Sequence, residues 1–499
     1  MTLSIELLKA KDEILKYAAS MGLEPFETVF ELIDYDQMNE VAAYGGFPTR
    51  YPHWRHGMEY EETAKGYAYG LHKIYELVIN NDPCYAYLMK ANSQIEQKMV
   101  IAHVYAHSDF FRNNMWFGKT NRKMMDEMAN HGTRIRKYSE KFGEDAVEKF
   151  LDTVLSLENL YNYHSVYSPT ISGMPASCEE KGDEQEPVRK LRAKEYLDRY
   201  INPPAFMQKQ RKKRKDAAAA RRKFPPRPEA DVLLFLLENA PIDTWQRDVL
   251  SIVREEAYYF APQAMTKIMN EGWATYWHSA IMTGKCSTDR EIIDYADLHS
   301  STMGTRPGVI NPYKMGLELY KNIEERWNKG QFGKEWDDCD DMVVKKKWDR
   351  NLGQGRQKIF AVRRIYNDIT FIDEFMTKEF CEEQKLFVYK YNEEANRYEI
   401  ADRDPTKVKK QLLQRLTNLG NPLVVVQDGN FENRGELLLH HEYDGVELQL
   451  DEATDVLVNL HHVWQRPVNI ETVVGGERKL VSFDGKEHKE TSLGKSEES

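Results

Sequence analysis

Two short segments, far apart in the chain, most constrain what this sequence can fold into. The first contains His103 and His107, and the second contains Glu271 within Asn270–Ala274. On a helix, residues four positions apart lie on the same face with Cβ atoms about 6 Å apart, so both imidazoles can bind one cation. The ligands come from both halves of the chain, so a shared metal ion requires the two halves to fold together.

The first segment is half of a zincin motif. Zincin proteases carry H-E-x-x-H, in which the two His bind zinc and the Glu is the general base. Here Val104 occupies the Glu position. The segment from Asn270 to His278 is similar to the E-G-W-A helix that supplies a distant Glu ligand in some gluzincin-like proteins, which makes Glu271 the predicted third ligand. The sequence therefore predicts a divalent metal site, with zinc as the expected ion, that lacks the usual protease base.

The surroundings of these residues favour a shared ion. His103 lies on an apolar helix between Met99–Ala102 and Phe110-Phe111, where buried imidazoles need polar partners. A Glu on a second apolar helix is costly to bury unless it is paired or coordinates a cation. The alternative is ordinary, because a His on a buried helix is often a hydrogen-bonded core residue.

Four further residues are candidates for the same site. His278 lies seven positions after Glu271, nearly on the same helical face, as a fourth ligand, a hydrogen-bond partner of a ligand or a core residue. Asp109 points off the His face and suits hydrogen bonding to a ligand. Glu256, and after it Glu255, are the predicted replacements for the missing general base, although a charged helix surface explains both equally well.

A second group of polar residues offers a rival site. His53, His56 and Glu59 have helical spacing just after Pro52. A solvated helix start explains this pattern better than a ligand set, so these residues are expected to line a pocket at most.

Composition excludes several classes of protein. The net charge of −11 argues against a general nucleic-acid-binding role, although residues 209–223 are strongly basic. The five cysteines are scattered and odd in number, which excludes a disulfide framework and fits a reducing cytoplasm. No apolar run approaches the roughly 20 residues that span a bilayer. We therefore expect a cytoplasmic globular protein.

Periodicity predicts a mainly α fold, with a helical, zincin-like N-terminal domain and a smaller α+β C-terminal domain. The helical domain covers residues 1–345, interrupted by a charged, partly disordered insertion at 168–230. Within it, residues 178–223 are expected to be a dispensable interaction segment. Strand-like runs and two helices predict the α+β domain at 350–475, and residues 476–499 are expected to form a flexible tail. The predicted helices of the first domain are Leu7–Met21, Glu61–Ile79, Ser93–Phe111, Thr120–Phe142, Asp145–Tyr163, Thr244–Phe260, Pro262–Met282, Asp289–Ser301 and Pro312–Asn328.

Five separated motifs, taken in order, resemble the stage V sporulation protein R (SpoVR) family over roughly residues 20–475. They are Tyr44–Arg50, His53-Trp54, Lys73–Asn80, Ala102–Asn114 and Asn270–His278. The resemblance implies a cytoplasmic bacterial protein that is linked, in spore formers, to formation of the spore cortex peptidoglycan. It also implies association with a sporulation-type serine protein kinase, but it supplies no mechanism.

Two functions remain open at this stage. One is a metal-dependent hydrolase that acts on amide bonds, for which the family phenotype indicates peptidoglycan precursors as substrates. The other is a non-catalytic interaction protein in a kinase-linked complex, with a structural metal or none, which the loss of Glu at position 104 favours. Nucleic-acid binding ranks below both.

Overall fold

The structure is a computed structural model that describes residues 3–68, 76–167, 224–392 and 395–495, together with residues 203, 207–209 and 212. Contacts divide the chain into two compact units. The first comprises Met1–Val147 and Tyr258–Gly420, and the second comprises Glu148–Ala257 and Asn421–Ser499. Each unit is therefore built from two separate stretches of sequence. Most of the predicted insertion at 168–230 lies outside the described residues.

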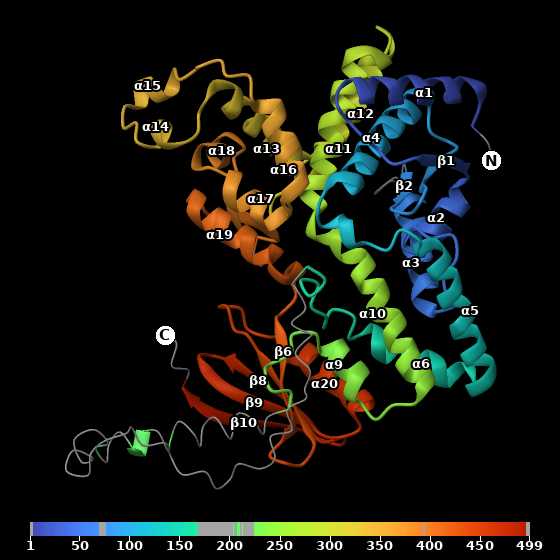
Figure 1. Ribbon diagram of the computed structural model, residues 1–499, viewed down its shortest axis with the longest axis vertical. Helices are drawn as coiled ribbons and strands as arrows, with labels where there is room; N and C mark the ends of the chain where they lie inside the picture. Colours follow the sequence, from blue (N-terminus) through green and yellow to red (C-terminus); the bar gives the residue numbers. More distant parts are fainter. Residues whose placement is uncertain are drawn as a thin grey trace, which may run out of the picture. The chain divides into compact units, whose positions relative to one another are not determined.

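Helices form most of the first unit. The predicted helix at Ser93–Phe111 is confirmed as α4 (Gln94–Asn113), which begins at a capping box between Ser93 and Glu96. Beside it lies α11 (Lys267–Ile281), as Figure 1 shows. The same apolar core also includes residues of α1 (Ile5–Ser20), α13 (Pro312–Lys329), α16 (Gly355–Ile365) and α17 (Asp368–Phe375). The predicted helices on either side of the insertion therefore pack together in one unit.

A three-stranded sheet lies in the same unit and was not predicted. Its strands are β1 (Thr28–Ile33), β2 (Glu76–Ile79) and β3 (Cys84–Met89), in the order β1-β3-β2. β3 pairs in parallel with β1 and antiparallel with β2. The predicted helix at Glu61–Ile79 is wrong at its end, since α3 covers Trp54–Ala68 and residues 76–79 form β2. Val78 and Ile79 are β-branched residues, which suit a strand.

Shorter elements complete the first unit. They are α2 (Tyr35–Ala43), η1 (Phe117–Lys119), α5 (Met124–Phe142), η3 (Met282–Cys286), α12 (Glu291–Thr302), α14 (Lys334–Asp337), α15 (Met342–Lys346), α18 (Lys378–Glu383), β4 (Val388–Asn392), β5 (Arg397–Asp402), α19 (Pro405–Leu416) and η4 (Thr417–Gly420).

The second unit contains a five-stranded sheet in the order β10-β9-β8-β7-β6. Its strands are β6 (Val424–Phe431), β7 (Glu436–His441), β8 (Val468–Val474), β9 (Glu477–Phe483) and β10 (His488–Lys495). β7 and β8 are parallel and are connected through α20 (Leu450–Trp464), which packs on β8 and β9. The apolar run after Asp231 forms α9 (Val232–Asn239), next to β6. Two helices, α6 (Glu144–Leu155) and α10 (Thr244–Met265), contribute residues to both units.

The units differ from the predicted domains in three places. Residues 148–167 and 231–257, predicted to be part of the helical domain, belong to the second unit. Residues 350–420 belong to the first unit, because Ile359, Val362 and Phe371 are buried in the same core as α4 and α11. The expected flexible tail at 476–499 is wrong for residues 477–495, which form β9 and β10. The turn between β8 and β9 is Gly475-Gly476, and both have positive φ, as a tight hairpin requires.

Two glycines bring α11 and α13 into backbone contact. A Cβ atom on Gly272 would lie 2.4 Å from Gly316 Cα, and one on Gly316 would lie 2.2 Å from the Ile268 carbonyl oxygen. Any larger side chain would separate the helices. This crossing fixes the position of Glu271, which directly precedes Gly272, relative to Tyr313 at the start of α13.

Candidate metal centre

The predicted ligands meet in the interior of the first unit. α4 supplies His103 and His107, whose ring centroids are 4.5 Å apart, and α11 supplies Glu271. The Glu271 Oε2 atom lies 3.4 Å from His103 Nε2 and 3.5 Å from His107 Nε2. All three side chains are buried, and their ligand atoms lie within 4.8 Å of one another. The fold therefore brings the three residues singled out from the sequence to one point.

The arrangement fits a divalent ion in two respects. Two ligand atoms that are each about 2.1 Å from a tetrahedral zinc ion lie about 3.4 Å apart. The two contacts of Glu271 Oε2 have this spacing, which is long for hydrogen bonds. Moreover, Oε2 is buried and has no hydrogen-bond partner among the described residues, whereas Oε1 accepts a hydrogen bond from Lys267 Nζ at 2.7 Å. A buried carboxylate oxygen without a donor is costly, and a cation between the three side chains would satisfy it.

The Nδ1 atoms of both imidazoles, on the side of each ring away from Glu271, contact polar neighbours. His107 Nδ1 donates a hydrogen bond to Asn270 Oδ1 at 2.8 Å, which leaves Nε2 free of a proton in the neutral ring. His103 Nδ1 lies 2.9 Å from His278 Nδ1, and His278 Nε2 lies 3.2 Å from His299 Nδ1. Such hydrogen bonds orient metal-binding imidazoles and fix their tautomers.

Burial and mutual charge set the protonation of the group. Burial, followed by the charge of His107, lowers the pKa of His103 to about 4. Burial also acts to lower the pKa of His107, but its contacts with Glu271 and Asn270 outweigh this and raise that pKa. Burial favours the neutral acid of Glu271, yet the two imidazoles hold its pKa well below the usual range. The group therefore contains a carboxylate at neutral pH and one imidazole that loses its proton easily.

A cavity of about 490 Å³ adjoins the cluster. Its lining includes His103, His278, Glu76, Met99, Asn311 and Tyr313. The ring of Tyr313 stacks on His103 with centroids 6.1 Å apart, and burial together with the Glu271 charge raises the pKa of Tyr313. Catalytic zinc sites combine three protein ligands with an open position, whereas structural sites are closed by four. A three-residue cluster beside a cavity has the arrangement of the catalytic type.

Two family models together match almost the whole chain. The family model described as SpoVR-like protein matches residues 3–421, and the model of the SpoVR-like C-terminal domain matches residues 422–475. The chain belongs to the SpoVR family. The chain is also similar to the uncharacterized protein YcgB of Escherichia coli K12, with 28% identity over 490 residues that cover 92% of this chain and 90% of YcgB. No solved structure gives a significant match.

Membership of the SpoVR family supports a link to sporulation. Across the parts of this chain that the structure describes, no helix is both long enough and apolar enough to cross a membrane.

In this SpoVR-family chain, the residue at the usual base position belongs to the core. Val104 is completely buried in the apolar cluster of the first unit. Valine carries no proton acceptor, so this position supplies no general base to the cluster.

Sequence analysis missed Glu76, which lines the cavity beside the His103, His107 and Glu271 cluster. Residues two apart on a strand face the same side, and Val78 packs against the core that contains α4. Glu76 is half-buried, and burial with the charge of Glu271 raises its pKa to about 7, against the opposing effect of His107. The predicted helix at Glu61–Ile79 covers this segment, whereas a strand there places Glu76 inward beside Val78.

The other predicted site residues are not members of the cluster of three ligands. His278 has the geometry of a hydrogen-bond partner, since its ring nitrogens contact His103 and His299. Glu256 is buried and Glu255 is exposed, on the part of α10 that belongs to the second unit. Neither is a member of the His103, His107 and Glu271 cluster. Their catalytic role stays a prediction.

Asp109 connects three helices near the site through buried hydrogen bonds. Its Oδ2 atom accepts hydrogen bonds from Trp273 Nε1 at 2.9 Å and from the Arg363 guanidinium at 2.6 Å. Its Oδ1 atom accepts from the Glu24 backbone N–H at 2.7 Å. This buried carboxylate joins α4, α11 and α16, two residues beyond His107, without a hydrogen bond to either imidazole among the described contacts.

Proposed function

We propose that this chain is a metal-dependent hydrolase of amide bonds that holds a divalent ion, zinc by its donor set, through His103, His107 and Glu271. The observation that carries the proposal is the buried Glu271 Oε2 atom, which faces both Nε2 atoms without a hydrogen-bond donor. One of these two imidazoles, His103, lines a cavity. Zinc bound there would activate water or polarise a carbonyl group. Two His and one Glu are also the protein ligands of thermolysin-type catalytic zinc sites.

We assign proton transfer and stabilisation of the oxyanion to residues that line the cavity. Glu76 is the proposed proton acceptor, in place of Glu256, because it lines the cavity that adjoins the ligands. The Tyr313 hydroxyl is a donor for the developing oxyanion, since this side chain lines the same cavity and stacks on His103. Asn270 and His278 orient the imidazoles through their Nδ1 atoms.

For the substrate we propose peptides of peptidoglycan precursors, in a sporulation-related role that includes formation of the spore cortex. Membership of the SpoVR family supports the sporulation link. Folded proteins are poor candidates, because Val104 replaces the base with which zincin proteases cleave them.

Elemental analysis and a hydrolysis assay together test this proposal. We expect the purified protein to contain about one zinc per chain and to release free amines from peptidoglycan stem peptides, with little cleavage of casein. Removal of the metal by a chelator should abolish release, and added zinc should restore it. Protein without a bound divalent metal after growth and purification in zinc-supplemented medium would refute the proposal.

The second candidate is a non-catalytic protein that acts in a complex with a serine protein kinase. The observation that favours it is the apolar, fully buried residue at position 104. Metal binding without turnover of any amide substrate, together with co-purification of a kinase, would support this function over the hydrolase.

A further inference from the structure

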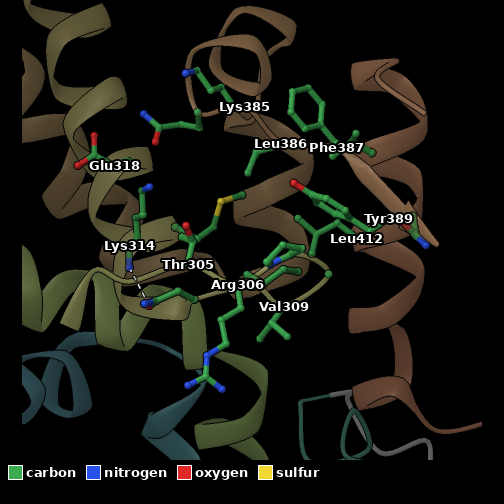
Figure 2. Close-up of a pocket in the computed structure, with 18 of the residues that line it drawn as sticks. Thr305, Arg306, Val309, Lys314, Glu318, Lys385, Leu386, Phe387, Tyr389 and Leu412 are labelled. Carbon is green, nitrogen blue, oxygen red and sulfur yellow. Dashed lines mark hydrogen bonds between the residues drawn. The ribbon is translucent and has the colours of Figure 1, made fainter. Parts of the chain in front are cut away.

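A second cavity lies in the first unit, beside α13 and α19. Its volume is about 330 Å³, and Figure 2 shows the residues around it. Its apolar floor is formed by Met315, Phe380, Val408 and Leu412, all of which are buried. The Tyr389 hydroxyl points toward the middle of the space in Figure 2. The cavity therefore offers apolar surface and a hydroxyl to a bound molecule.

Positive charge surrounds this apolar floor. Lys314, Lys385, Arg415 and Arg306 line the cavity, against a single carboxylate, Glu318. Glu318 already pairs with Lys321 Nζ at 3.1 Å. None of the four lining cations forms an ion pair within the described residues. Cations gathered beside apolar surface without a counter-charge favour an anionic ligand with an apolar body.

One loop connects this cavity with the cavity beside the His103, His107 and Glu271 cluster. Arg306, Val309 and Ile310 line both spaces. The loop turns tightly, with a hydrogen bond from the Val309 N–H to the Arg306 carbonyl at 3.2 Å and with Gly308 at φ +77°. In Figure 2 the Arg306 guanidinium points away from Tyr389. Val309 is 62% exposed and Ile310 is 40% exposed, so this loop presents aliphatic surface on the way from one cavity to the other.

We propose that the second cavity binds the acidic part of the substrate, and that this substrate is a short peptide with carboxylate groups beside an apolar side chain. The cations bind the carboxylates of the peptide, and the apolar floor contacts its apolar side chain. The loop at 306–310 directs the rest of the peptide toward the proposed metal centre. Only the position of the cleaved bond rests on the proposed hydrolase function. Binding itself uses no residue of the metal cluster.

Calorimetric titration of the full-length protein, as purified, with N-acetyl-leucyl-glutamate tests the inference. We expect binding that weakens as salt is added and at least about tenfold weaker binding of the neutral N-acetyl-leucyl-glutamine amide, because the neutral peptide loses its charged hydrogen bonds to the cations. Lys314→Gln and Arg415→Gln should each weaken binding of the acidic peptide by about tenfold. Lys410→Gln is the matched control, since Lys410 is exposed on α19 like Arg415 but does not line the cavity.

Unchanged melting temperatures of the variants would show that a loss of affinity reflects the lost charge. Equal affinity for the acidic and the neutral peptide would overturn the inference, as would an equal effect of Lys410→Gln and Arg415→Gln. Binding of inorganic phosphate alone, without binding of the peptide, would also overturn it. Retained peptide binding in a protein that neither holds metal nor hydrolyses amides would uphold this inference and refute the proposed hydrolase.

Discussion

Gly272 of α11 and Gly316 of α13 touch backbone to backbone, one residue from the Glu271 carboxylate. The contact explains why the segment after Glu271 requires glycine, which has no Cβ atom. It also ties the geometry of the site to helix packing, because Glu271 and Tyr313 lie on the two helices that cross here.

Replacement of Gly272 by alanine should destabilise the protein, because the new Cβ would overlap the backbone of α13. We expect a loss of about 1–3 kcal/mol in the free energy of unfolding, measured by denaturant titration. Gly57→Ala is the control, since Gly57 is helical and a Cβ atom added there would meet nothing within 4 Å. That substitution should be neutral or stabilising by up to about 1 kcal/mol. Equal stability of the two variants would contradict the proposed contact.

Replacement of His107 by alanine should lower bound metal and thermal stability together, because an ion shared by α4 and α11 couples metal affinity to folding. Elemental analysis and thermal unfolding, with and without added zinc, measure both effects. The control is His462→Ala, which removes an exposed imidazole on α20. Metal content that is the same in His107→Ala and wild type would refute the ligand assignment.

Metal affinity should rise with pH across the neutral range. His107 has a raised pKa in the metal-free protein, so a proton competes with the ion there. His103, whose pKa is lowered to about 4, is already neutral and adds no competition above that pH. Below the pKa of His107, affinity should therefore increase about tenfold per pH unit, with release of about one proton on binding. Chelator competition at several pH values checks this, and an affinity independent of pH between about 5 and 7 would contradict it.

Replacement of Glu76 by glutamine should slow hydrolysis of stem peptides by about a hundredfold to ten-thousandfold while metal content is kept, because it removes the proposed proton acceptor. Glu256→Gln, on α10 of the second unit, is the matched comparison and should have little effect on turnover. The reverse result, with Glu256→Gln inactive and Glu76→Gln active, would restore the assignment made from sequence.

The parts of the site that depend on local spacing were predictable from sequence. The convergence of His103 and His107 follows from their spacing on a single helix. The apolar residues around Glu271 indicated a buried carboxylate. Glu76 was not predictable in this way, since its direction depends on the pairing of β2 with β3, a contact set by tertiary structure. The same holds for β9 and β10, whose polar residues read as a tail until they pair with β8 and with each other.

The division of each unit into two stretches of sequence has a consequence for synthesis on the ribosome. His103 and His107 emerge long before Glu271, and the residues from Glu148 to Ala257, which belong to the other unit, are made in between. A nascent chain therefore carries an exposed imidazole pair without its carboxylate partner while that intervening stretch is translated. The ion that we propose for this site would therefore meet the full cluster only in the later part of translation, after α11 has left the ribosome.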